Sequence, residues 1–351
     1  GGLVEAEGKL WGMTQEGGEF GDGVVFSIDT SGTNFNKVLD LSGSSFGRFS
    51  SNPLAVLDDR VYGMTQIAGL YNQGTIFKVN PLNNQSELVK ALNRNSLAYD
   101  FDRSLVDAYG KLWGISTEGG PSNAGNVFSI NRDGTDFTVV HDFDLAEGPY
   151  SPLGSLTAAF SRLWGVTELG GTYDGGVLFS LDAQGGDFTV HHEFGQFPDG
   201  VTPNYDLLVR EGQIFGTTSE GGDNLAGTIF SNNADGSGYT ILAAFDFDNG
   251  AFPTGGLIDV NGKLWGVTEE GGTDENGNIF TINYDGSELT TLYEFQDAGD
   301  GFFPRPTLVA YGSKVYGSTQ GNELTTATGK SLFSLNTDGT GLQIEKKLTA
   351  N

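Results

Sequence analysis

Aromatic and acidic side chains gather in segments that end at a proline and recur along the chain. The stretches "GQFPDGVTPN", "DFDNGAFPT" and "QDAGDGFFPRP" each place phenylalanine within a few residues of aspartate. An aromatic face can cover the C–H groups of a sugar ring while carboxylates bind its hydroxyls, so the combination is typical of a carbohydrate-binding surface. The candidate ligand-binding residues are Tyr150, Phe197, Phe252, Phe302, Asp248, Asp297, Asp300 and Arg305. The structural alternative is that these rings fold inward and plug the fold.

Closely spaced oxygen ligands make calcium the candidate cofactor. The stretches "DFDNG", "NRDGTD" and "NYDGSE" offer such ligands, but no complete EF-hand loop is present. The candidate metal ligands are Asp246, Asp248, Glu5, Asp107 and Asp259. The last three lie six residues before a repeated aromatic, on a strand expected to line a central channel. The alternative is that they are simply solvated there, without a metal.

Residues for acid–base catalysis are scarce. The only histidines are His141, His191 and His192, and each falls in the last strand expected in its repeat, far from the channel. Paired carboxylates such as Asp248 with Asp297 could serve a glycoside hydrolase, so that hypothesis remains as an alternative. The sequence does not give the distance between the two carboxylates.

Charge and composition exclude several classes of partner. The 351 residues carry a formal charge of −27, from 45 acids against 18 bases, which repels nucleic acid and anionic membranes. No stretch is long and apolar enough to insert into a membrane. The absence of cysteine excludes disulfides and thiolate chemistry. The opening "GGLVEAEG" shows no signal peptide, so we expect a mature or trimmed domain.

A short phrase built on an aromatic followed by glycine occurs seven times. Its aromatics are Trp11, Tyr62, Trp113, Trp164, Phe215, Trp265 and Tyr316. A leucine precedes each aromatic by eight residues, and an apolar run ending in phenylalanine follows each phrase at nearly constant spacing. Three registers that agree along the whole chain indicate a structural repeat of about fifty residues.

Each repeat predicts four antiparallel strands. Unit six reads "GGLIDV", "KLWGVT", "NIFTIN" and "ELTTLYEF", separated by turns with Asn-Gly, Gly-Gly or Asp-Gly. Seven such units predict an all-β, seven-bladed β-propeller as a single domain over residues 1–351. The expected blades are approximately 1–50, 51–102, 103–151, 152–203, 204–252, 253–303 and 304–351. We favour whole blades in chain order; the alternative adds residues 2–6 to the last blade.

The repeated phrase has an expected packing role. Its aromatic should wedge between neighbouring blades, and its glycine should permit close approach of an adjacent sheet. Two kinds of loop are expected on the face opposite the short hairpin turns. They are the mid-repeat loops, between the second and third strands, and the inter-repeat loops, between one repeat and the next. These loops are long and uneven, so recognition is expected there, with Phe20, Tyr71 and Tyr173 adding rings from the mid-repeat loops.

The unit "LWGVTEEGGTDENGNIFTINYDGSELTTLYEFQDAGDGFFPRPTLV" resembles the GloVer tandem-repeat family. Shared features are the aromatic–Gly–x–Thr phrase, Gly-Gly, Gly–x–apolar–Phe, Asp-Gly and a proline-bearing loop. Unit two departs from the pattern with Ala68 and with "NPLNNQS" in place of the Asp-Gly turn, and unit seven departs with "GNE". The resemblance implies exported bacterial proteins with a propeller-like array, often modular and anchored to the cell surface, but no particular activity.

The leading hypothesis is an extracellular binding or adhesion module. It would recognise a polysaccharide, or a cell-surface glycan or protein, through the mid-repeat and inter-repeat loops, with calcium as a possible aid. A bacterial cell-surface location and a larger modular parent protein are expected, with neither nucleic acid nor membrane insertion. The alternatives are a secreted polysaccharide-degrading hydrolase or lyase with its site on the same loops, and a structural spacer.

Overall fold

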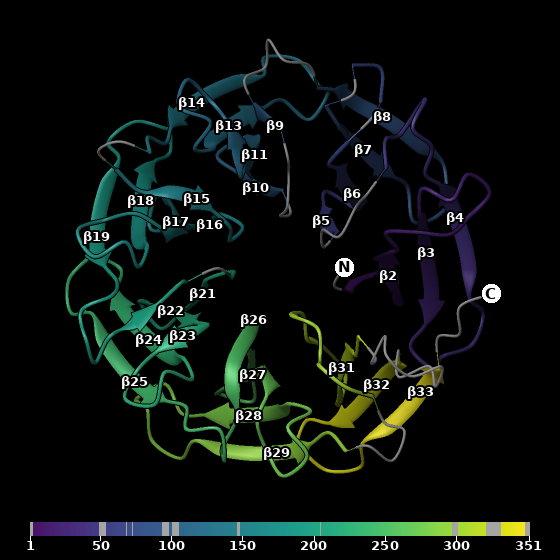
Figure 1. Cartoon of the computed structure of the whole chain (residues 1–351). Coiled ribbons are helices and arrows are strands. Elements are labelled where there is room, and N and C mark those ends of the chain that lie inside the picture. Colours follow the sequence, from purple (N-terminus) through teal and green to yellow (C-terminus); the bar gives the residue numbers. More distant parts are fainter. Residues whose placement is uncertain are drawn as a thin grey trace. The chain divides into compact units, whose positions relative to one another are not determined.

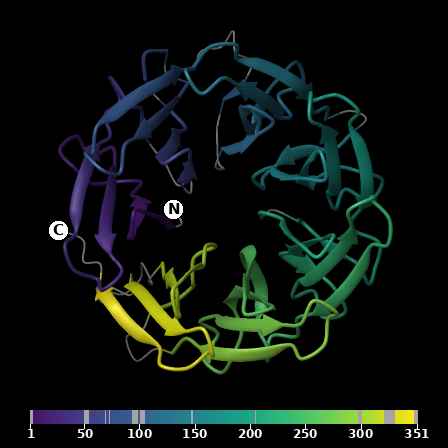
Figure 2. The ribbon, with the colours of Figure 1, turned by 180° about the vertical axis from the view of Figure 1, so that it is seen from behind.

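The structure is a computed structural model, and its elements are all β-strands. It describes residues 3–48, 54–67, 69–71, 73–92, 98–99, 105–145, 148–203, 205–296, 301–320 and 331–347. No helix occurs among these residues, and so none that could span a membrane. Figures 1 and 2 show the strands from opposite sides, coloured along the chain.

The strands form seven antiparallel blades in chain order, the fold class of a seven-bladed β-propeller. The chain divides into two compact units, residues 1–172 with 176–191 and residues 173–175 with 192–351. The first contains three blades and most of the fourth, and the second contains the last three. The chain passes between them on either side of residues 173–175, in the mid-repeat loop of blade four, and again within the last strand of that blade.

The strands of the first four blades run from β1 to β19. They are β1 (Val4–Ala6), β2 (Lys9–Met13), β3 (Val24–Asp29), β4 (Asn36–Asp40), β5 (Ala55–Leu57), β6 (Arg60–Thr65), β7 (Thr75–Val79), β8 (Ser86–Ala91), β10 (Val106–Ala108), β11 (Lys111–Ser116), β13 (Asn126–Ile130), β14 (Thr138–Asp142), β15 (Tyr150–Pro152), β16 (Thr157–Ala159), β17 (Arg162–Leu169), β18 (Val177–Asp182) and β19 (Thr189–Glu193). A small sheet pairs β9 (Ala98–Tyr99) with β12 (Glu118–Gly119).

The strands of the last three blades run from β21 to β33. They are β21 (Leu208–Arg210), β22 (Gln213–Thr218), β24 (Thr228–Asn233), β25 (Thr240–Ala244), β26 (Ala251–Val260), β27 (Lys263–Glu270), β28 (Asn278–Ile282), β29 (Thr290–Glu294), β30 (Val309–Tyr311), β31 (Lys314–Ser318), β32 (Ser331–Asn336) and β33 (Gln343–Lys347). A second small sheet pairs β20 (Gly200–Val201) with β23 (Glu220–Gly221).

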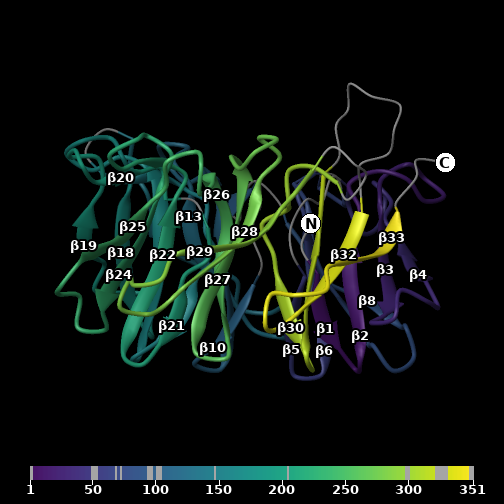
Figure 3. The same cartoon turned by 90° about the horizontal axis from the view of Figure 1, so that it is seen from below.

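Whole blades in chain order are confirmed. The first strand, β1, pairs with β2 of its own blade, and β30 opens a separate last sheet with order β30-β31-β32-β33. Residues 4–6 therefore belong to blade one, and the alternative that placed them in the last blade is wrong. In the blades whose mid-repeat loops the structure describes, the hairpin turns and these loops lie at opposite ends of the strands, which Figure 3 shows lengthwise.

The glycine of the repeated phrase has a different role from the one expected. A Cβ built on Gly114 would lie 2.4 Å from Cζ of Phe128 and 3.1 Å from Cδ2 of Leu105, both in the same blade. Gly114 and Phe128 are direct cross-strand partners of β11 and β13. The expectation that the glycine admits an adjacent sheet is therefore wrong: it admits the phenylalanine ring of its own blade. Every blade repeats this arrangement of glycine and phenylalanine.

The aromatic of the phrase does act as a wedge. Trp113 is buried, and within the first unit it packs in one cluster with Leu163 and Phe179 of the following blade. Its indole N–H donates to the carbonyl oxygen of Ala108 at 2.9 Å, so its polar atom is satisfied as well. All seven of these aromatics are buried. Four others pack on the following blade in the same way, namely Trp11, Tyr62, Phe215 and Trp265. Being buried, none of the seven can stack on a ligand from solvent.

Candidate functional site

The candidate site is the inter-repeat loop that follows β19, residues 194–203. The loop begins at Phe194, which is fully buried and contacts the rings of Phe230 and Tyr239 at 5.2 and 5.7 Å between centroids. Further along, the loop lies directly on blade five, because a Cβ at Gly200 would come within 2.1 Å of Oγ1 of Thr218. The backbone N–H of Thr202 donates to the carbonyl oxygen of Gly175 at 3.0 Å. The loop is therefore fixed at both ends.

The middle of the loop is held by one buried carboxylate, Asp199. Its Oδ1 accepts hydrogen bonds from the Tyr239 hydroxyl at 2.6 Å and from the Gly200 backbone N–H at 2.8 Å. Its Oδ2 accepts from Nε2 of His192 at 2.7 Å. Charge-assisted hydrogen bonds of this length are among the stronger ones in proteins. We call these three side chains, Asp199, Tyr239 and His192, the loop anchor.

The rings of the loop anchor also pack on one another. The planes of His192 and Tyr239 lie 8° from parallel, with centroids 3.4 Å apart. Burial, together with the hydrogen bond to Asp199, holds the pKa of the Tyr239 phenol well above its usual value of 10.0. Tyr239 therefore stays protonated and serves as a hydrogen-bond donor throughout the physiological pH range.

The loop anchor supports an exposed aromatic edge. The side chain of Phe197, two residues before Asp199, is 72% exposed, and that of Tyr173 is 49% exposed. The Tyr173 hydroxyl donates to Oε1 of Gln196 at 3.1 Å, and a Cβ on Gly195 would lie 2.9 Å from Cβ of Tyr173. Phe197 and Gln196 are thus exposed on a fixed loop, and Tyr173, from the mid-repeat loop of blade four, is exposed beside Gln196. Such an edge can stack on a flat apolar face and hydrogen-bond its substituents.

The other predicted ring residues are less exposed. Tyr150, in β15, and Phe252, in β26, are both partly buried against the core clusters of their units. The Phe252 ring meets Phe247 edge to face at 5.7 Å, and the partly buried Phe302 lies against Phe303 at 6.5 Å. The packing of Tyr150 and Phe252 against core clusters is of the kind expected from the inward-facing alternative, and ligand binding by the three residues stays a prediction.

The charged residues predicted for the binding surface are only partly described. Asp248 and Arg305 are exposed, and Asp297 and Asp300 lie outside the described residues. Oδ1 of the exposed Asp246 accepts from the backbone N–H of Asn249 at 2.9 Å, which fixes the turn between them. The structure does not bring Asp248 or Arg305 to the Phe197 edge.

The strand acids proposed as calcium ligands have protein partners. Asp107 pairs with Arg132 at 2.6 Å, and Asp259 pairs with Arg210 at 2.7 Å. Oε1 of Glu5 accepts from the backbone N–H of Gly8 at 2.7 Å. In the part of the chain that the structure describes, no group of three or more acids or histidines is arranged to hold a metal. Calcium binding stays a prediction.

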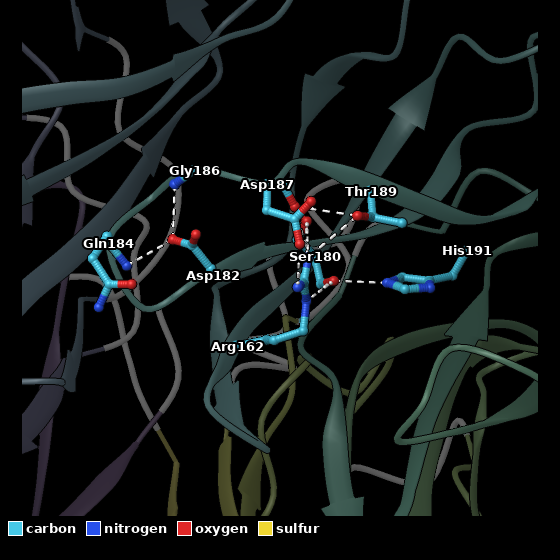
Figure 4. A network of polar contacts seen from close by, with 8 residues as sticks. All are labelled: Arg162, Ser180, Asp182, Gln184, Gly186, Asp187, Thr189 and His191. Carbon is cyan, nitrogen blue, oxygen red and sulfur yellow. Dashed lines mark hydrogen bonds and ion pairs between the residues drawn. The ribbon is translucent and has the colours of Figure 1, made fainter.

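A polar network in blade four, drawn in Figure 4, is a variant of a repeated structural feature. Nη1 of Arg162 pairs with Asp187 at 2.8 Å, its Nε donates to Ser180 at 2.6 Å, and Ser180 contacts Nε2 of His191 at 2.7 Å. Blade seven has Lys314, Ser334 and Glu345 at the positions of Arg162, Ser180 and His191. These three side chains are also in contact with one another. The recurrence indicates a structural tie rather than a catalytic centre.

The histidines lie in the fourth strands β14 and β19, as predicted. His141 stacks on Phe188 with centroids 4.0 Å apart, and burial lowers its pKa. The folded state therefore resists protonation that the unfolded chain accepts below a pH of about 6.5. Leu39 occupies the matching position of blade one.

We expect His141→Leu to make the free energy of unfolding depend less on pH below neutrality. Between pH 8 and pH 5.5, the wild type should lose more free energy of unfolding than the variant, by at most about 1.4 kcal/mol per pH unit. Denaturant unfolding across this range measures the difference. Parallel pH curves for the two proteins would contradict the prediction.

The fold and the site together define a β-propeller repeat protein with a fixed, partly aromatic loop. The chain belongs to the Gloeobacter/Verrucomicrobia repeat family, whose model matches residues 1–161 and 147–330. This confirms the family indicated by the repeat pattern. No curated protein matches the chain in sequence.

Solved structures share the fold at low sequence identity. A puromycin-hydrolyzing peptidase from Mycobacterium tuberculosis is 13% identical with a TM-score of 0.64, and the match covers 99% of this chain and 53% of that one. A putative 6-phosphogluconolactonase from Bacteroides uniformis is 11% identical with a TM-score of 0.62, covering 98% and 95%. The extracellular domain of a putative one-component system from B. thetaiotaomicron is 12% identical with a TM-score of 0.62, covering 94% and 37%. The chain spans about half the length of the peptidase, and the likeness extends to the fold alone.

Proposed function

We propose that this protein is an extracellular binding module, which recognises a glycan or a glycan-bearing surface partner through its mid-repeat and inter-repeat loops. The observation that carries the proposal is Phe197, a large aromatic side chain that is 72% exposed on a loop fixed by buried hydrogen bonds. A flexible loop would lose conformational entropy on binding, whereas a fixed one avoids that cost. An aromatic side chain exposed on a fixed loop is available to stack on the apolar face of a sugar.

The net charge of the protein restricts the class of glycan that it can bind. A protein with a formal charge of −27 repels polyanions at long range, so a neutral or cationic glycan suits it better than a polyuronate or a sulfated chain. Tyr173 and Phe197 supply the apolar contact, and the exposed Gln196 amide supplies hydrogen bonds to hydroxyl groups. A surface location on a bacterial cell, as part of a larger modular protein, follows from the family resemblance and belongs to the same proposal.

A glycan array tests the proposal directly, with arms with and without calcium. We expect micromolar binding of at least one neutral glycan, and a loss of about tenfold in Phe197→Ala and in Tyr173→Ala. The matched control is Leu225→Ala, because Leu225 is 67% exposed on the mid-repeat loop of blade five but makes no part of this edge. Absence of any bound glycan, or equal losses in all three variants, would overturn the proposal.

The same experiment separates the alternatives. A polysaccharide-degrading enzyme requires two carboxyl groups at catalytic spacing. If a bound oligosaccharide is shortened during incubation, as read by mass spectrometry, the enzyme hypothesis replaces simple binding. If no partner is ever bound, the spacer hypothesis is favoured.

A further inference from the structure

Blade two carries a polar pocket of about 440 Å³ at the end where its hairpin turns lie. Its lining residues are Arg60, Lys78, Asn80, Gln85, Ser86 and Glu87. Arg60 opens β6 and Lys78 lies in β7, while the other four lie in the turn and at the start of β8. The pocket belongs wholly to the first compact unit. It lies at the opposite end of the strands from the mid-repeat and inter-repeat loops.

Three of the other blades fill the equivalent place with an ion pair. A basic residue two positions before the repeated aromatic reaches an acid eight positions after the repeated phenylalanine. The pairs are Lys111–Asp136 at 3.1 Å, Arg162–Asp187 at 2.8 Å and Lys263–Glu288 at 2.8 Å. In these blades the positive charge of the basic side chain is neutralised within the blade.

Blade two keeps the basic residue but has no acid at the matching position. Lys9 and Lys314, in blades one and seven, also lack that acid but pair with Asp29 and Glu345 instead. Arg60 occupies the basic position, and Gln85, eight residues after Phe77, occupies the position of the acid. Among the described residues, no carboxylate pairs with Arg60, and its Nη1 donates to the carbonyl oxygen of Asp59 at 3.0 Å. The guanidinium keeps further N–H donors for a ligand, since it carries five in all.

The pocket lining of blade two contains a second positively charged residue, Lys78, in addition to Arg60. The residue after the repeated phenylalanine is serine or threonine in six blades and Lys78 in blade two. Lys78 is 21% exposed in its side chain and pairs at 3.3 Å with Glu87, which is 67% exposed. Two cations and one acid leave the lining with one surplus positive charge, in a chain whose formal charge is −27.

The turn of blade two completes the pocket with amides. The sequence "NPLNNQS" replaces the Asp-Gly turn of blades three, five, six and seven. Oδ1 of Asn80 accepts from Leu82 N at 3.0 Å, and Oδ1 of Asn83 accepts from Gln85 N at 3.0 Å. The side-chain oxygens of these asparagines are thus used inside the turn. The Asn80 side-chain N–H groups, on the lining, remain as donors.

We propose that the blade-two pocket binds a small oxyanion, a carboxylate, sulfate or phosphate group, between Arg60 and Lys78. A guanidinium binds oxyanions through paired N–H groups, and an ammonium adds a compact point charge. Two departures of unit two from the repeat, Lys78 and the turn that contains Asn80 and Gln85, fall together on this pocket. The overall negative charge limits the ligand to a small or singly charged group. The proposal is independent of glycan binding by the loops.

Two variants that restore residues of the other blades provide the test. Lys78→Ser removes one cation, and Gln85→Glu supplies the acid that pairs with the basic residue elsewhere, so both should fold as the wild type does. Isothermal titration with inorganic phosphate, sulfate and glucuronate at constant ionic strength should show millimolar or tighter binding of at least one anion. Both variants should weaken it at least about tenfold. The three anions distinguish phosphate, sulfate and carboxylate sources.

Lys263→Gln is the matched control, because it removes a cation at the equivalent position of blade six, where the charge is already paired. We expect its anion affinity to equal that of the wild type. The proposal fails if the wild type binds none of the three anions up to about 10 mM. It also fails if Lys78→Ser and Gln85→Glu bind as tightly as the wild type, or if Lys263→Gln loses affinity equally.

Discussion

Gly114→Ala is expected to destabilise the protein by about 3 kcal/mol, because the added methyl group has no space between two strands of one blade. Its Cβ would lie 2.4 Å from Cζ of Phe128, well inside van der Waals contact. Phe128 is fully buried, so its ring can move only by displacing neighbours in the core cluster around Leu105 and Leu112. Denaturant unfolding of the two proteins measures the change.

Two further variants isolate the steric cause. Gly148→Ala is the matched control, because a Cβ there would meet only the carbonyl oxygen of Asp144, at 3.6 Å. We expect a change within about 0.5 kcal/mol for it. The double variant Gly114→Ala with Phe128→Leu should recover part of the loss, since a shorter side chain leaves room for the methyl group. If Gly114→Ala were as stable as Gly148→Ala, the close fit of glycine and ring would be disproved.

The repeat itself was predictable because three positions recur with nearly the same period: a leucine, an aromatic followed by glycine, and a phenylalanine. Leucine, glycine and phenylalanine recur together since each blade needs one small residue opposite one ring. The partner of the glycine was predicted wrongly, however. Periodicity identifies which positions are constrained, but the pairing of Gly114 with Phe128 depends on the exact register of β11 against β13. A shift of one residue would have turned the ring to the other face of the sheet.

The candidate site was predictable only in outline. The composition of the inter-repeat loops pointed to Phe197 together with Phe252 and Phe302, and nothing in residue type separates them. Their exposure depends on the path of each loop over the next blade. Phe197 is 72% exposed, while Phe252 turns inward beside Phe247. Loop paths are decided by long-range contacts that a local pattern does not contain.

The loop anchor escaped prediction for a related reason. His192 was judged from its strand alone, and Asp199 was one acid among many. Tyr239 lies 40 residues beyond Asp199 in the chain, so only the structure brings the hydroxyl and the carboxylate together. A usable signal was present in hindsight: histidine is rare in this chain, and His192 lies only seven residues before Asp199.

Removing the carboxylate of the loop anchor should loosen the site and destabilise the fold. We expect Asp199→Ala to cost about 2–3 kcal/mol, because the Tyr239 hydroxyl, the His192 ring and the Gly200 N–H lose a shared buried acceptor. Tyr239→Phe removes only one donor and should cost about 1 kcal/mol. Denaturant unfolding measures both. Amide hydrogen exchange at Gly222, whose N–H donates to the backbone carbonyl oxygen of Asp199 at 2.9 Å, reports whether the loop opens locally.

The matched control is Asp248→Ala, since Asp248 is an exposed acid on the next inter-repeat loop. It should change stability by less than about 0.5 kcal/mol and leave exchange at Gly222 as it is. Asp199→Asn separates hydrogen bonding from charge, because it keeps an acceptor for Tyr239 and should cost less than alanine. Glycan binding should weaken in Asp199→Ala although Asp199 is buried beneath the exposed edge, because Phe197 is then no longer held in place. Equal stability and unchanged exchange in Asp199→Ala would mean that the loop is held by its ends, Phe194 and Thr202, without the anchor.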